Sequence, residues 1–72
     1  MRVRVEDAAA AADLEEFLRA RLDAIVERAG RRELEVSLLG SYSDTALRDE
    51  VEIALRRWAL RSKRPQSAFE IE

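Results

Sequence analysis

Three short segments of the chain alternate apolar with charged or polar residues, and this alternation limits the layers that the protein can form. The segments cover residues 2–5, 33–39 and 68–72. A period of two is typical of strands that have one buried and one solvated face. A sheet with helices on both faces would instead have continuous apolar strands. We therefore expect every helix to cover the same face of the sheet.

The first predicted helix follows the first strand. Asp7 can cap it, because a carboxylate accepts a hydrogen bond from a free backbone N–H of the first turn. We expect the helix to begin between Ala8 and Asp13 and to end at Gly30, since glycine favours the left-handed position beyond a helix end. Residues at helical spacing form its apolar stripe, with two flanking residues: Leu14, Leu18, Leu22, Ile25 and Ala29, flanked by Phe17 and Val26.

The second predicted helix runs from about Thr45 to about Arg61. Ser43 or Asp44 can cap it, and Pro65 prevents its continuation. Its apolar stripe is Leu47, Val51, Ala54, Leu55 and Trp58.

The predicted fold is a single α/β domain over residues 1–72. It is a two-layer sandwich in which a three-stranded sheet carries two helices on one face, in the order β-α-β-α-β. Right-handed crossovers between parallel strands favour the sequential strand order. Pairing of Arg2 and Arg4 with glutamates on both sides would instead place the first strand in the centre. We favour the sequential order unless one strand is antiparallel.

The composition argues against several classes of function. Thirteen basic and fifteen acidic side chains give a net charge of −2, which does not favour nucleic-acid binding over the whole surface. Histidine and cysteine are absent, so the commonest general base and the thiol nucleophile are missing. We expect no enzyme, no cofactor and no metal site. No segment resembles a signal peptide or a membrane span, and we expect a cytoplasmic bacterial protein.

Two large aliphatic residues do not fit the apolar stripe of the second helix. Ile53 and Leu60 lie seven residues apart and nearly opposite that stripe. Phe17, at the edge of the first helix's stripe, could extend the same surface. A chain of this size has a thin core and often gains stability by association. We therefore predict a non-catalytic interaction module that forms a homo-oligomer, most simply a dimer, or binds another protein. A sheet edge that adds a strand is a second possible contact.

The first alternative function is anion binding at the loop that precedes the second helix. Phosphate or a nucleotide could bind Gly40, Ser41, Ser43 and Thr45, because helix N-termini attract anions. However, the loop lacks the Gly-Lys-Ser/Thr ending of a P-loop, and Asp44 would repel an anion.

The second alternative is nucleic-acid binding through residues 56–64, which contain five basic side chains around Trp58. An exposed aromatic ring among basic residues suits single-stranded nucleic acid. Trp58, however, lies in line with Leu47 and Val51, so its position in the sequence favours the core.

Overall fold

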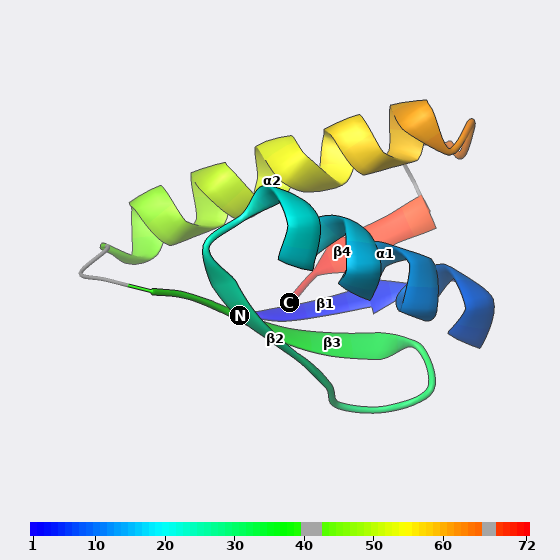
Figure 1. The fold of residues 1–72 in the computed structure, drawn as a ribbon, viewed down its shortest axis with the longest axis horizontal. Coiled ribbons are helices and arrows are strands. Elements are labelled where there is room, and N and C mark those ends of the chain that lie inside the picture. Colours follow the sequence, from blue (N-terminus) through cyan, green and yellow to red (C-terminus); the bar gives the residue numbers. More distant parts are fainter. Residues whose placement is uncertain (40–42, 66–67) are drawn as a thin grey trace.

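The computed structural model describes residues 1–39, 43–65 and 68–72 (Figure 1). Within them the elements follow in the order β1 (Arg2–Val5), α1 (Ala8–Arg21), β2 (Ala24–Arg28), β3 (Glu33–Leu38), α2 (Asp44–Arg61) and β4 (Phe69–Ile71). The strands form one antiparallel sheet in the order β2-β3-β1-β4. This βαββαβ arrangement is the split βαβ topology of ferredoxin-like domains.

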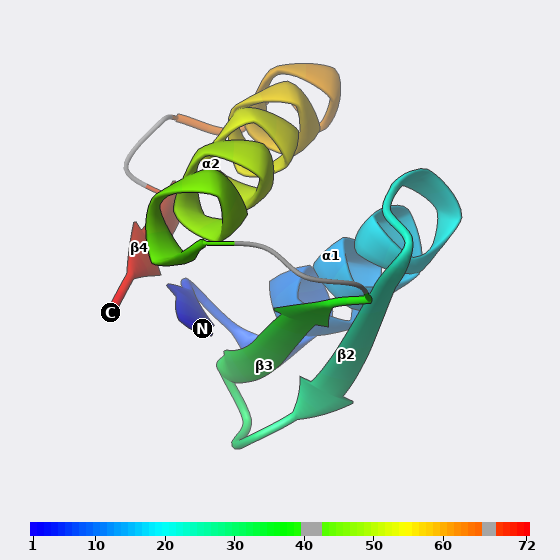
Figure 2. The ribbon, with the colours of Figure 1, turned by 90° about the vertical axis from the view of Figure 1, so that its left-hand side faces the viewer.

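Both helices cover the same face of the sheet, as predicted (Figure 2). The core between the layers consists of one face of each helix and the inward side chains of the strands. Val3 and Val5 of β1 are buried there, whereas Arg2 and Arg4 point to the open face. No helix in the described part of the chain combines the length and the hydropathy needed to cross a membrane.

The prediction of three strands was wrong, because the first helix ends at Arg21 and not at Gly30. Leu22 is already extended, and residues 24–28 form β2, which pairs with β3 along five register positions. Ile25 and Val26 are β-branched and fit a pleated strand better than a helix. In β2, Val26 is buried and Ile25 faces outward, whereas the predicted stripe had Ile25 in the core and Val26 on its flank. Gly30 lies in the turn 29–32, which is closed by the Ala29 N–H donating to the Glu33 carbonyl at 2.9 Å.

The sequential strand order, which we favoured unless one strand is antiparallel, is not observed, because the strands are antiparallel. The extra strand β2 forms a hairpin with β3, so the chain reverses and β3 runs antiparallel to β1. The rule for parallel crossovers consequently does not apply between β1 and β3. The alternative based on charge is the one observed, since Arg4 of the central strand faces Glu33 on one side and Glu70 on the other.

The helices otherwise begin and pack as expected. The Asp7 carboxylate accepts from the Ala10 N–H at 2.7 Å, and the Ser43 hydroxyl accepts from the Ala46 N–H at 3.1 Å. The two predicted apolar stripes supply these buried residues: Leu14, Leu18, Val51, Ala54, Leu55 and Trp58.

The C-terminus of α2 is closed by a Schellman motif. The Arg64 N–H donates to the Ala59 carbonyl at 2.7 Å, and the Lys63 N–H donates to the Leu60 carbonyl at 3.2 Å. Lys63 has a φ of 56°, in the left-handed region, where a side chain is sterically costly and glycine is usual.

Replacing Lys63 with glycine should therefore stabilise the protein. Relief of the left-handed strain outweighs the extra chain entropy of glycine, and we expect Lys63→Gly to raise the free energy of unfolding by about 0.5–1 kcal/mol. Arg61→Gly, inside the last turn of α2, serves as the matched control and should lower it by up to about 1 kcal/mol. Chemical denaturation of both variants tests this. A decrease for Lys63→Gly would contradict the assigned cap.

Charges cross the open face of the sheet between β1 and β3. Glu35 accepts from the N-terminal ammonium group at 3.1 Å and from Arg2 Nε at 3.3 Å. The hydrogen bond from the ammonium group is the largest contribution to a lowered pKa of Glu35; Arg2 lowers this pKa further, and burial partly opposes the shift.

A lowered pKa in the folded state makes Glu35 stabilising only while it is ionised. Its contribution is complete above the ordinary glutamate pKa of about 4.3 and is lost as the pH falls through the lower folded value. Glu35→Gln should therefore lose stability at pH 7 and differ less from the parent in strong acid. Denaturation curves at both pH values measure this difference. An equal loss in strong acid would show that the charge of Glu35 is not the cause.

Candidate functional site

Four large apolar side chains are notably exposed among the described residues, and they form two pairs. Ile53 and Leu60 on α2 are 48% and 71% exposed, in agreement with their spacing in the sequence. Ile25 and Leu39, at 49% and 48%, lie on the open face of the sheet. There Ile25 faces Ser37, and the Leu39 N–H extends the hairpin by donating to the Asp23 carbonyl at 3.0 Å. Each pair is a possible contact surface.

A groove runs between α1 and α2 beside the first pair. It consists of two adjoining depressions, of about 360 and about 220 Å³, that share Phe17 and Arg21. Ile53 lines the smaller depression together with Phe17, so the fold brings two of the three predicted interface residues together. Leu60 lines neither depression. It lies two helical turns beyond Ile53 on α2, a rise of about 10 Å.

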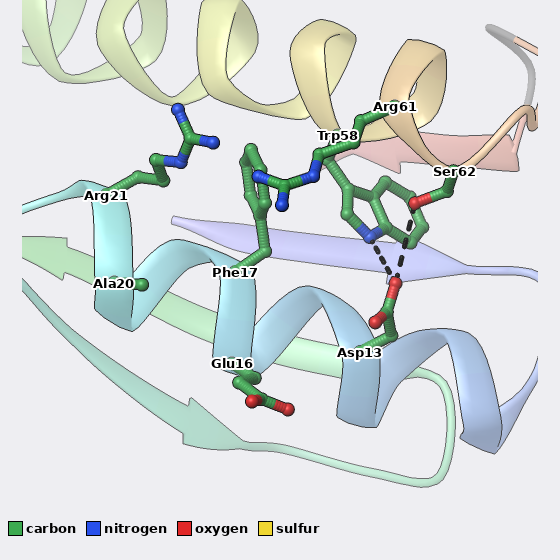
Figure 3. Close-up of a pocket in the computed structure, with 8 residues that line it drawn as sticks. All are labelled: Asp13, Glu16, Phe17, Ala20, Arg21, Trp58, Arg61 and Ser62. Atoms are coloured by element: carbon green, nitrogen blue, oxygen red, sulfur yellow. Dashed lines mark hydrogen bonds between the residues drawn. The ribbon is translucent and has the colours of Figure 1, made fainter.

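Contacts between the two helices lie along the wall of the larger depression (Figure 3). Trp58 is only 1% exposed, and its indole N–H donates to Asp13 Oδ2 at 2.8 Å. The Ser62 hydroxyl reaches the same oxygen at 3.5 Å. Asp13 therefore connects α1 with the C-terminal end of α2. No pattern in the sequence indicates this contact, because Asp13 and Trp58 are 45 residues apart.

Arg64 supports Trp58 from outside the groove. Its guanidinium group lies 5.2 Å from the centre of the indole ring and forms an ion pair with Glu6. In the sequence Arg64 is only the last residue of the basic run 56–64, and neither contact follows from its position there.

Charged side chains of both signs surround the groove. Arg21 of α1 lies over the Phe17 ring at 5.1 Å and lines the larger depression together with Arg61 of α2 (Figure 3). Glu50 and Arg57 line the smaller depression with Ile53. Within the described chain, none of these four charged residues takes part in an ion pair. The arrangement resembles the mixed polar rim around the apolar centre of a protein interface.

The other candidate sites receive less support from the geometry. Gly40 and Ser41 of the predicted anion loop lie outside the described residues. The Ser43 hydroxyl already caps α2, and Thr45 is exposed beside Met1 and Arg48.

In the basic run 56–64, Trp58 is buried and offers no free ring for base stacking. Arg56 pairs with Glu52 at 2.8 Å. Over the described ranges, no group of three acidic side chains is arranged to hold a metal ion.

The contact between Trp58 and Asp13 predicts how substitutions at these two residues change the stability of the protein. Trp58→Ala should lower the free energy of unfolding by about 3–5 kcal/mol, because it leaves a cavity between the layers. Asp13→Ala keeps the core volume and leaves the indole N–H unpaired, so a loss of about 1–2 kcal/mol is expected. Thermal and chemical unfolding test both values. A Trp58→Ala variant that melts within a degree or two of the parent would contradict burial of the ring.

Comparison with known proteins finds no match for this chain, whether among family models, curated proteins or solved structures.

Proposed function

We propose that the chain is a non-catalytic association module that binds a second copy of itself through the outer face of its helical layer. The observation that carries this proposal is the exposure of Ile53 and Leu60, two turns apart on α2 and next to the groove that contains Phe17. Solvated helix faces normally carry polar residues. A line of large aliphatic side chains beside an aromatic groove is more typical of a contact surface.

The size of the chain supports the same proposal. A domain of this length buries only about 60% of the surface that its unfolded chain exposes. Association adds stability to the folded state by mass action. Dimers with two-fold symmetry are the commonest soluble homo-oligomers. Such a dimer would bury Ile53 and Leu60 from both copies.

The surface suits weak association. Complete burial of an isoleucine or leucine side chain contributes roughly 1.5–3 kcal/mol, and these side chains are already partly covered. Forming the complex costs at least about 4 kcal/mol in lost motion. We therefore expect a weak dimer that dissociates at micromolar to tens of micromolar concentration, so that protein concentration controls its population.

Sedimentation across a dilution series tests the proposal. The parent should shift from monomer to dimer as its concentration reaches tens of micromolar, and its melting temperature should rise with concentration. The double variant Ile53→Lys/Leu60→Lys should stay monomeric, because it would bury unpaired charges at the contact.

The chain offers a matched control on the other face of the sheet. Ile25→Lys/Leu39→Lys changes the charge equally and removes a similarly exposed aliphatic pair. This variant should associate as the parent does. A parent that is monomeric at tens of micromolar would overturn the proposal. If both double variants lose association equally, the association depends on general apolar contact and not on α2.

A further inference from the structure

We propose that the two copies pack α2 against α2 in antiparallel orientation, with Ile53 near the two-fold axis and the acidic half of each helix against the basic half of the other. This inference rests on the proposed function and adds the geometry of the contact. It follows from the order of charges on the exposed face of α2.

Around Ile53, the charged side chains are separated by sign along α2. Asp49 and Glu50 precede it, Arg56 and Arg57 follow it, and all four side chains are exposed. At 100° per residue these positions lie within about 60° of Ile53 around the helix, on either side of it. The exposed ridge therefore has an acidic half, an aliphatic centre and a basic half.

The helix dipole does not account for this order. Its effect is confined to the first and last turns of a helix. Since α2 extends from Asp44 to Arg61, Asp49 and Glu50 lie beyond the first turn and Arg56 precedes the last. The separation of charges lies in the middle of the helix.

Ion pairs within the chain explain only part of this separation of charges along α2. Arg56 forms an (i, i+4) ion pair with Glu52 at 2.8 Å. In the part of the chain that the structure describes, Asp49, Glu50 and Arg57 form no ion pair. These three side chains are available to a second molecule.

An antiparallel pair about Ile53 brings opposite charges together. Residues before Ile53 face residues after Ile53 of the second copy on the same side of the apolar line, so Asp49 meets Arg56 of the second copy and Glu50 meets Arg57. Parallel packing in register would oppose each charge to itself. Exposed pairs of this kind contribute little to affinity, but they determine orientation and disfavour wrong pairings.

The same register provides space for Leu60. Leu60 lies seven residues after Ile53 and faces Ala46 of the second copy, which lies seven residues before it. Ala46 is a small, half-buried residue, so a large side chain can pack above it. Ala46, Ile53 and Leu60 thus form one apolar line with a period of seven, the spacing that helices use when they pack along each other.

Charge reversal in two separate variants tests the orientation. Asp49→Arg/Glu50→Arg makes the whole ridge basic, and Arg56→Glu/Arg57→Glu makes it acidic. Each variant alone should associate at least about tenfold more weakly than the parent, since like charges then meet across the axis. An equimolar mixture should form a mixed dimer, and a chain with all four substitutions should again pair with itself. Sedimentation with one variant fluorescently labelled measures all three results.

A control separates this pairing from simple attraction between oppositely charged proteins. Glu27→Arg/Glu70→Arg changes the net charge as much as the basic ridge variant does, but on the open face of the sheet. Mixed with the acidic ridge variant, it should form much less mixed dimer than the basic ridge variant does, because its own acidic half still meets an acidic half. Mixed dimer in equal amount would overturn the proposed register.

The parent alone gives a second measurement that needs no variant. Added salt screens exposed charges, with a Debye length of about 10 Å at 0.1 M, so dimerisation should weaken as salt rises. A parent that forms dimers with no dependence on salt, and variants that associate as it does, would overturn the antiparallel arrangement while leaving the proposed function standing. A monomeric parent would overturn both.

Discussion

The sheet has an apolar inner face and a mainly charged outer face, and the remaining architecture follows from this asymmetry. On the central strand β1, Val3 and Val5 are buried under the helices, while Arg2 and Arg4 lie among glutamates on the other side. Burying these charges under a third layer would cost more than their pairing returns. Both helices consequently share one face of the sheet and pack side by side. Each keeps an outer surface that no element of the described chain covers.

This arrangement gives α2 two different faces. Its inner face contributes Val51, Leu55 and Trp58 to the core, and Trp58 is held by Asp13 from α1. Its outer face carries Ile53 and Leu60, which add nothing to the core. The contact between Asp13 and Trp58 joins the two helices at the larger depression, which adjoins the depression that Ile53 lines. The stability of the fold and the geometry of the proposed contact thus depend on the same pair of helices.

The sequence was most informative where a residue's own chain neighbours determine its environment. Both helix caps and the outward position of Ile53 follow from spacing within one element. The strand β2 was missed because Leu22, Ile25 and Ala29 have helical spacing by coincidence, while pairing with β3 is a contact between separate segments. The choice between the two strand orders stayed open for the same reason, since it depended on a hairpin that reverses the chain and that the spacing did not indicate. The Asp13–Trp58 contact, over 45 residues, leaves no pattern in the sequence at all.

Charge also explains why α2, and not the sheet, is the surface proposed for self-association. The exposed pair on the sheet, Ile25 and Leu39, lies beside Glu27, which directly faces Glu35 across β2 and β3. Glu35 is paired with Arg2 and the N-terminal ammonium group, whereas Glu27 forms no ion pair in the described chain. A two-fold contact at that position would bring unpaired Glu27 carboxylates together, and like charges in contact oppose association. The ridge on α2 carries both signs in an order that an antiparallel copy complements. The two faces expose similar apolar side chains, and the charges around each pair are the reason for proposing α2, and not the sheet, as the surface that binds a second copy.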